Sequence, residues 1–443
     1  MNFLLVLSFT LGLFLPRQDV PKGRQGTFAI TNVRLETVSN GVIEHGTIVI
    51  HADRIEAVGS DVAVPPGAEV IDGTGMTVYP GMFDSGTRLG LTEIGAVGET
   101  NDSREVGDLN PQMEALTAVN PNSVLIPVTR VSGVTTVIAE PSGGMFPGVA
   151  ALINLEGYTP EQMHAGGVRL MVLDFPASGR RSRFDRRSDD DVKKAATKAM
   201  KKLDETWDRA ILFARIDSAY RAHPDPDRVP EYAPEIAALA PVVRGELPLM
   251  IRVNREKDIR VALAWVKKRG LKHVVFSGVA EGWRVADKIA EAGIPCLVGP
   301  VLSVPTRESD RYDRAYANAG LLRKVGVEVA IRTGDAENVR NLPFNAGFAA
   351  AYGLGKDEAL SAVTLAPARI FGIDGDYGSL EPGKKANLFI ADGDPFETRT
   401  QVRQVFIDGF KIPMTNRQIE LYKEFLHRDE GRLKPVEVTK PSH

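Results

Sequence analysis

The segment Thr77–Gly90, TVYPGMFDSGTRLG, decides the fold of this 443-residue chain. It begins as an apolar strand, which ends at the turn-forming pair Pro80-Gly81 and leads through Asp84 into a loop. Short strand patterns precede the segment, and a long alternation of strands and helices follows it. We therefore interpret it as the boundary between two structural parts.

Strand patterns occur at both ends of the chain. Between residues 26 and 78, three stretches rich in Val, Ile and Thr alternate apolar and polar positions, as half-buried strands do. Similar stretches return as GSLEPGKKANLFIADGDPF (378–396) and VRQVFIDGFKI (402–412). Because these stretches flank a long middle region, we expect the two ends to build one small β-sandwich together.

The middle region alternates short apolar runs with amphipathic helical stretches, which predicts a (β/α)8 TIM-like barrel in the α/β class. A doubly wound sheet is the alternative, but no candidate strand is followed by a Gly-rich phosphate turn. The eight candidate strands are Tyr79–Ser85, Gly133–Ala139, Ala150–Leu155, Arg169–Asp174, Leu247–Val253, His273–Ser277, Pro295–Gly299 and Glu328–Thr333.

We expect four regions along the chain. Phe3–Leu15 is too short to span a bilayer but suits the apolar part of a signal peptide, so we assign residues 1–22 to export to the periplasm or outside. The alternative is an apolar segment packed on a cytoplasmic domain. The composite sandwich takes 26–79 and 373–415, the barrel 80–372, and a C-terminal helix and tail 416–443.

Composition excludes several classes of function. The apolar fraction of 43% and the charged fraction of 25% are those of an ordinary globular protein. A net charge of -3 gives no reason to expect nucleic acid as a partner. We expect a small-molecule ligand, no membrane span, and leave a homo-oligomer open.

Several stretches resemble the amidohydrolase superfamily, particularly its imidazolonepropionase-like and prolidase-like branch. They cover most of residues 27–411, and the one leading back into the sandwich is highly specific. The stretches are IDGTGMTVYPGMFD (71–84), RVSGVTTVIAEPSGG (130–144), TGDAENVRNLPFNAG (333–347) and LSAVTLAPARIFGI (360–373), followed by the GSLEPG segment.

The resemblance implies a metal site that this sequence does not complete. Members of the superfamily hold divalent metal through histidines of the first, fifth and sixth strands and an Asp of the eighth, and they hydrolyse C–N bonds of amides and cyclic amides. The aligned histidine positions here are Gly86, Arg88, Arg252 (with Asn254) and Gly278, and only the acid remains, as Asp335. We therefore expect no metal by the usual motif.

The candidate site residues follow from the same alignment. Asp335 is the candidate general base, with Arg88 and Arg252 as candidate catalytic cations, because guanidinium pairs bidentately with anions. The candidate substrate-binding residues are Glu140, Arg332, Glu281, Asn338 and Arg340. The arginines alternatively form a structural salt-bridge cluster with Asp335 and Glu140.

Three hypotheses remain open for the function. The first is a metal-deficient homologue, a possible pseudoenzyme, that binds a small molecule or a partner. The second is a hydrolase of C–N or ester bonds that uses Asp335 with Arg88 or Arg252. The third is an enzyme whose Zn, Fe, Mn or Mg is held by acids such as Glu99, Asp102, Glu140 and Asp335.

Overall fold

The structure is a computed structural model that describes residues 23–179 and 185–427. The expected signal peptide (1–22) and the end of the C-terminal tail (428–443) lie outside the described residues. Within those residues, no helix combines the length and the apolar character that crossing a membrane requires.

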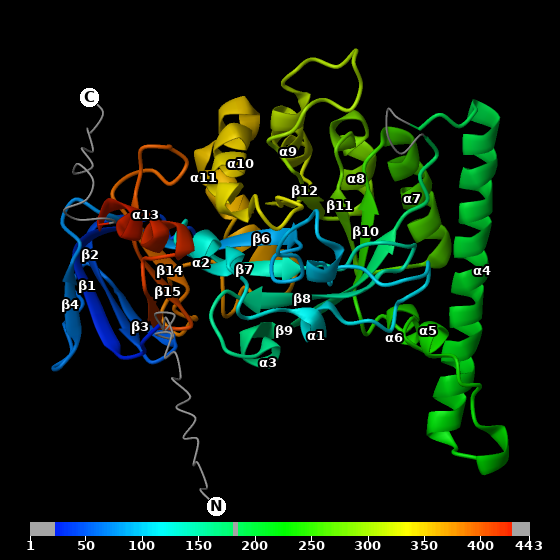
Figure 1. The fold of residues 1–443 in the computed structure, drawn as a ribbon, viewed down its shortest axis with the longest axis horizontal. Coiled ribbons are helices and arrows are strands. Elements are labelled where there is room, and N and C mark those ends of the chain that lie inside the picture. The colour runs from blue at the N-terminus through cyan, green and yellow to red at the C-terminus, as the bar shows by residue number, and fades with distance from the viewer. Residues whose placement is uncertain (1–22, 180–184, 428–443) are drawn as a thin grey trace, which may run out of the picture.

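One eight-stranded sheet combines the two ends of the chain (Figure 1). Its order is β16-β15-β14-β5-β1-β2-β3, and β4 pairs in parallel with β1. The antiparallel pairing of β14 with β5 joins the C-terminal strands to the N-terminal ones. The strands are β1 (Thr27–Glu36), β2 (Val42–His51), β3 (Arg54–Gly59), β4 (Glu69–Asp72), β5 (Thr77–Pro80), β14 (Leu388–Ala391), β15 (Val402–Ile407) and β16 (Phe410–Ile412).

This sheet folds over itself to enclose a core. The rings of Phe28 on β1 and Phe406 on β15 meet edge to face with centroids 5.1 Å apart, although β5 and β14 lie between their strands in the sheet order. Ile30, Ile48 and Leu388 are fully buried in the same cluster. The expected composite β-sandwich is therefore confirmed.

The Pro-Gly pair of the deciding segment forms the passage from this sandwich into the barrel. A Cβ at Gly81 would lie only 2.2 Å from Thr135 Oγ1, so only glycine fits there. The Gly81 amide also donates to the Asn387 carbonyl at 2.8 Å. Position 81 thus needs glycine because Thr135 and Asn387, from two other parts of the chain, pack directly against it.

The second sheet is the barrel, with the order β13-β12-β11-β10-β9-β8-β7-β6. Its strands are β6 (Met82–Thr87), β7 (Val134–Ala139), β8 (Gly148–Asn154), β9 (His164–Asp174), β10 (Leu249–Val253), β11 (Val274–Gly278), β12 (Cys296–Val298) and β13 (Val329–Ile331). Each overlaps one of the eight candidate strands. The TIM-like barrel is therefore confirmed, with one difference in strand direction.

That difference is β8, which pairs antiparallel with both β7 and β9. A (β/α)8 barrel has only parallel strands. The connecting residues 140–147 and 155–163 contain no helix longer than the single turn α3 (Pro160–Met163), and a parallel crossover needs a longer connection. The barrel is therefore mixed: β6 pairs in parallel with β7, the strands from β9 to β13 pair in parallel, and β8 runs in the opposite direction.

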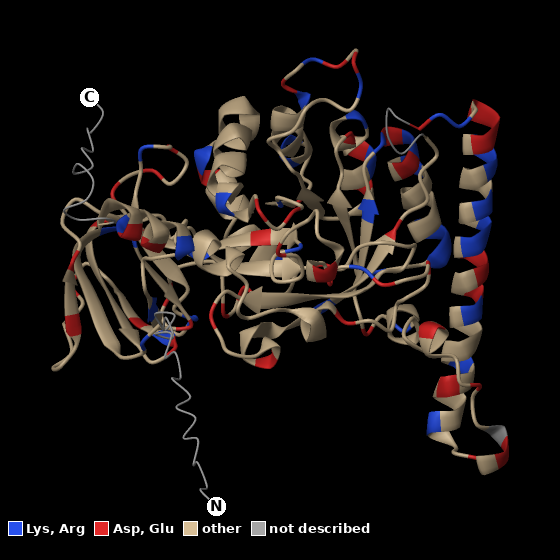
Figure 2. Ribbon diagram, in the orientation of Figure 1, with Lys and Arg blue, Asp and Glu red and all other residues tan. Residues whose placement is uncertain are grey.

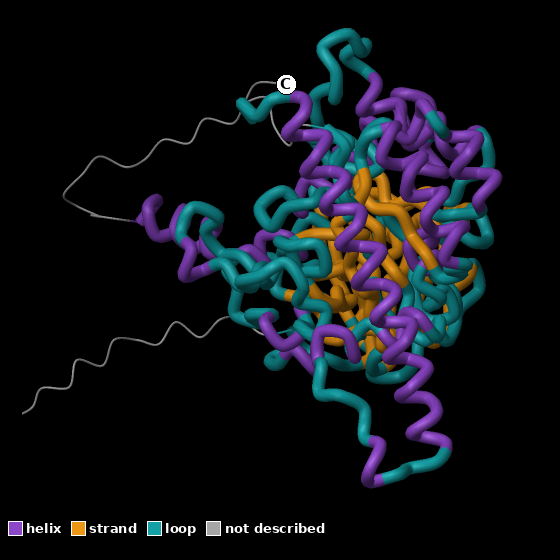
Figure 3. The backbone as a smooth tube through the Cα atoms, turned by 90° about the vertical axis from the view of Figure 1, so that its right-hand side faces the viewer, coloured by secondary structure: helices purple, strands orange, loops and turns teal. Residues whose placement is uncertain are grey.

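Helices pack around the barrel strands, and Figure 3, viewed from the side of α4, shows helices in front of and beside the strands. In chain order the other helices are α1 (Ala115–Ala118), α2 (Leu125–Arg130), α4 (Asp189–Ala222), α5 (Pro234–Ala237), α6 (Ala240–Val243), α7 (Glu256–Arg269), α8 (Ala286–Ala292), α9 (Arg314–Lys324), α10 (Leu342–Ala349), α11 (Lys356–Ala362), α12 (Leu365–Ile370) and α13 (Arg417–His427). Short 3-10 or π turns are η1 (Gly98–Thr100), η2 (Pro226–Arg228), η3 (Gly282–Arg284), η4 (Val339–Asn341) and η5 (Ala350–Leu354).

The long helix α4 extends past the barrel, and Figure 2 shows both signs of charge along it. Its N-cap is Ser188, whose side chain accepts a hydrogen bond from the Asp191 amide at 3.1 Å. Trp207 and Leu203 bury its inner face. The charged residues therefore form a solvated outer face.

Candidate functional site

The carboxyl ends of the barrel strands bring a set of charged side chains together. Parallel strands of a barrel end at one face, so residues at their ends converge there. The converging residues are Asp84 and Gly86 on β6, Glu140 after β7, Asp174 at the end of β9, Arg252 on β10, Ser277 on β11 and Arg332 after β13.

Arg332 lies at the centre of this set. Its Nη1 donates to Glu140 Oε2 at 3.2 Å, and its Nη2 donates to Glu140 Oε1. Nη1 also donates to Ser277 Oγ. Arg332 and Glu140 are 6% and 2% exposed, so this is a buried ion pair between β7 and β13. The Arg332 Nε has no hydrogen-bond acceptor among the described residues.

Arg252 extends the ion pair into a cluster of four charges. Its Nε and Nη2 donate to the two oxygens of Asp174 at 2.6 and 2.9 Å. Its Nη1 lies 3.7 Å from Glu140 Oε1. Two guanidinium groups and two carboxylates therefore neutralise one another at the barrel mouth.

Asp84 closes the barrel between its first and last strands. Its Oδ1 accepts from the amides of Gly86 and Thr333, each at 3.1 Å, and its Oδ2 accepts from Thr333 Oγ1. The Gly334 amide donates to the Gly86 carbonyl at 2.9 Å beside it. Complete burial raises the pKa of the Asp84 carboxyl to about 7, although the hydrogen bonds from Thr333 and Gly86 lower it.

Two of the positions aligned with metal-binding histidines are glycines whose space other side chains occupy. A Cβ at Gly86 would lie 2.9 Å from Arg332 Cζ. A Cβ at Gly278, where φ is +87°, would lie 2.4 Å from Asn254 Oδ1. The Arg332 guanidinium and the Asn254 amide therefore occupy the places that side chains at these positions would take.

Arg88 differs from the other two arginines of the site. It follows β6 directly and is half-buried. No hydrogen bond or ion pair of its guanidinium to another described residue is present, whereas Arg252 and Arg332 are both paired with acids. Arg88 thus presents a guanidinium without an acid partner among the described residues.

Asp335, the candidate general base, caps the turn that follows the last strand. Its Oδ1 accepts from the Glu337 and Asn338 amides at 2.8 and 3.3 Å, and its Oδ2 accepts from Asn338 Nδ2 at 2.8 Å. Its backbone carbonyl accepts from Thr87 Oγ1. Asn338 and Arg340 are exposed in this turn. The arginines are paired with Glu140 and Asp174, and not with Asp335.

Glu281 anchors the loop that follows β12. It accepts hydrogen bonds from Arg307 Nε and Nη2, each at 2.7 Å, from Thr306 Oγ1 at 2.8 Å and from the Glu256 amide at 2.8 Å. Burial alone would raise its pKa, but these donors outweigh it and lower the pKa of Glu281 to about 2. Its carboxylate therefore holds the 299–313 loop to the start of α7.

The donors present do not fit the divalent metal that the resemblance implies. The aligned histidine positions offer no imidazole, and the carboxylates of Glu140 and Asp174 are already bound to arginines. Within residues 23–179 and 185–427, no three His, Cys, Asp or Glu side chains form a group that could hold a metal. Glu99, Asp102, Glu140 and Asp335 are accordingly not assembled into an acid-only site.

Asp174 is the residue that sequence reasoning missed. It ends the candidate strand Arg169–Asp174, and an acid at the carboxyl end of a barrel strand points to the mouth. That position was a sufficient signal. Ser277, at the end of another candidate strand, also belongs to the site, because its hydroxyl accepts a hydrogen bond from Arg332.

Comparison with known proteins agrees with this architecture. The model of the Amidohydrolase family matches residues 264–412. Imidazolonepropionase of Mesorhizobium japonicum is 23% identical over 406 residues, which is 84% of this chain and 93% of the relative. N-substituted formamide deformylase of Arthrobacter pascens is 27% identical over 165 residues, 31% of this chain and 30% of the relative. An amidohydrolase structure from Thermotoga maritima superposes with a TM-score of 0.77 at 22% identity, covering 88% of this chain and all of that one.

Proposed function

The chain belongs to the amidohydrolase superfamily, and we propose that it binds a small anionic molecule at its barrel mouth without metal-assisted hydrolysis of C–N bonds. The relatives that it resembles include an imidazolonepropionase and an N-substituted formamide deformylase. We propose the same scaffold as in these relatives but a different chemistry, because arginines and glycines stand at the strand ends where the resemblance implies metal-binding histidines.

The observation that carries the proposal is the place of the Arg332 guanidinium. It fills the space next to Gly86 and is held there by Glu140 and Ser277. A metal ion acidifies a bound water, whereas a guanidinium stays protonated and supplies only charge and hydrogen bonds. Among the described residues, the place of this guanidinium beside Gly86 supports a mouth that works without the usual catalytic ion.

Arg88 supports an anion as the ligand. The charges of Arg252 and Arg332 are balanced by Glu140 and Asp174, so a ligand need not displace them. Arg88 is half-buried and unpaired among the described residues, and partial burial strengthens its attraction for a carboxylate or phosphate. An anion that reaches Arg88 would give this guanidinium the counter-charge that no described acid supplies to it.

A metal-independent hydrolase is the second candidate, and the unpaired Arg88 is the observation that favours it. A free guanidinium near a strand end can stabilise an oxyanion. The carboxylate of Asp335, however, accepts three hydrogen bonds within its own turn, which leaves it poorly placed to take a proton from water. The binding function therefore has more support.

Metal content and ligand binding test the proposal together. The full chain, grown with added zinc, manganese and iron and purified without chelator, should retain substoichiometric metal by mass spectrometry. Calorimetric titration with a panel of small mono- and dicarboxylates and inorganic phosphate should find a saturable ligand. Arg88→Gln should weaken that ligand about ten-fold, and Arg88→Lys should recover part of the loss.

Arg209→Gln is the matched control, because Arg209 is an exposed arginine on α4. Stoichiometric metal in the purified chain would contradict the proposal, as would equal binding by the Arg88 and Arg209 variants. Turnover of amides, N-substituted formamides or esters that survives EDTA and disappears in Asp335→Asn would favour the second candidate instead.

A further inference from the structure

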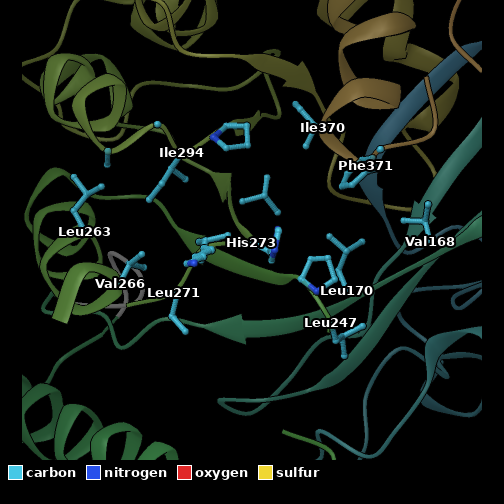
Figure 4. Close-up of a pocket in the computed structure, with 18 of the residues that line it drawn as sticks. Val168, Leu170, Leu247, Leu263, Val266, Leu271, His273, Ile294, Ile370 and Phe371 are labelled. Carbon is cyan, nitrogen blue, oxygen red and sulfur yellow. The ribbon is translucent and has the colours of Figure 1, made fainter. Parts of the chain in front are cut away.

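A large cavity lies at the other end of the barrel, where the strands begin. Its volume is about 1020 Å³, which is in the upper range for small-molecule sites. It is bounded by the first residues of β9 and β11, by the residues just before β10, by helices α7 and α8, and by the turn after α12. Figure 4 shows His273 among the lining residues, with Leu263 and Val266 of α7 on one side and Phe371 on the other.

Apolar side chains form part of the walls of this cavity, alongside charged ones. Leu170 and Val266 are buried beneath it, and Leu247, Leu263 and Phe371 remain partly exposed to it. At three lining positions, Gly167, Gly293 and Gly372, a Cβ would meet no atom within 4 Å. These glycines, all with positive φ, supply turns and no side chain, so the space between strand ends and helices stays open.

The charge around the cavity is positive once paired residues are set aside. Three charged residues of the lining are already in ion pairs. They are Arg169 with Glu114, Arg260 with Glu256, and Glu246 with Arg244. Lys267, Lys272 and Lys288 are exposed lining residues with no ion pair to another described residue, and Glu291 is the acid that remains among them. Three ammonium groups against one carboxylate, beside the apolar side chains of the lining, match an anion that has an apolar body.

We propose that this cavity is a second binding site, separate from the barrel mouth, for an amphiphilic carboxylate with a straight hydrocarbon chain. The chain lies against Leu247, Leu263 and Phe371, and the carboxylate faces the lysines at the rim. Burial of methylene groups supplies most of the affinity, and the lysines select the anion over a neutral chain of equal length.

Decanoate and decanol are the probes, because they share a ten-carbon chain and differ in charge at neutral pH. Calorimetry on the full chain should find one saturable site for decanoate and weaker binding of decanol. The combined substitution Lys267→Gln, Lys272→Gln, Lys288→Gln should weaken decanoate about ten-fold and leave decanol unchanged. Ala264→Trp, which places an indole in the cavity from α7, should weaken both.

Two controls separate this site from other sources of binding. Lys257→Gln removes an exposed lysine from the other end of α7, and Ala195→Trp adds an indole to the exposed surface of α4; neither should change binding. Circular dichroism verifies that each variant is folded. Absence of saturable decanoate binding overturns the proposal. Binding that Ala264→Trp leaves intact also overturns it, because the ligand would then lie elsewhere.

Discussion

The Arg332 guanidinium lies where a side chain at Gly86 would have to be, with Cζ 2.9 Å from the position of a Cβ at residue 86. In the same way, Asn254 Oδ1 lies 2.4 Å from the position that a Cβ at Gly278 would take. At each of these two glycines, a side chain from another strand end occupies the space that a side chain at the glycine would need. The glycine and the side chain that occupies its space form one packing arrangement, so substitutions at the two positions are expected to be energetically coupled.

We expect Gly86→Ala to lower the free energy of unfolding by about 1–3 kcal/mol, because the added methyl group overpacks against a guanidinium that Glu140 and Ser277 hold in place. Denaturant unfolding measures the change. In an Arg332→Ala background the same substitution should cost less. Gly95→Ala is the control, since a Cβ there meets nothing within 4 Å. Equal costs at residue 86 in both backgrounds would show that the two positions are independent.

The buried ion pair gives a second prediction. Glu140→Gln leaves Arg332 buried without its main counter-charge and should destabilise the chain by about 3–5 kcal/mol. The control is Glu358→Gln, which breaks the exposed Arg323–Glu358 pair and should cost about 0–1 kcal/mol. Chemical denaturation compares the two variants. Similar small costs would mean that Ser277 and the nearby carboxylate of Asp174 satisfy Arg332 without the charge of Glu140.

Sequence patterns predicted the scaffold better than the site. Alternation and apolar runs identified all eight barrel strands because burial imposes them directly. The antiparallel direction of β8 was missed, since its apolar run resembles that of a parallel strand and only the short connections distinguish the two.

The site depends on contacts between residues far apart in the sequence. The substitution of histidines at positions 86 and 278 was visible, but not that Arg332 and Asn254 would fill the vacated space. Likewise the pairing of Arg252 with Asp174 joins two strand ends, and no spacing rule within one segment reveals it. Such long-range contacts require the assembled barrel.

The buried carboxyl of Asp84 predicts a pH dependence of stability. Its folded pKa of about 7 lies above the ordinary value of 3.8, so between these limits the folded state binds more protons than the unfolded state. The contribution of Asp84 is therefore fully present below pH 3.8 and is lost as the pH rises through 7. The loss should be on the order of a few kcal/mol.

Asp84→Asn tests this, because the amide keeps the shape of the neutral carboxyl and can still accept from Gly86 and Thr333. The free energy of unfolding should fall less between pH 5 and pH 8 in the variant than in the unchanged chain. Parallel profiles for the two proteins would show that Asp84 is ionised in the folded state throughout this range.

Restoring histidines at the aligned positions tests whether the site lacks only metal ligands or also the space for them. Gly86→His with Arg88→His restores two imidazoles, but the first of them collides with Arg332. We therefore expect no stoichiometric zinc in this double variant, measured by mass spectrometry after gel filtration. Adding Arg332→Ala removes the collision and frees the carboxylate of Glu140, so the triple variant should retain zinc through imidazole and carboxylate ligands. Zinc in the double variant with Arg332 still in place would contradict the role assigned to that guanidinium.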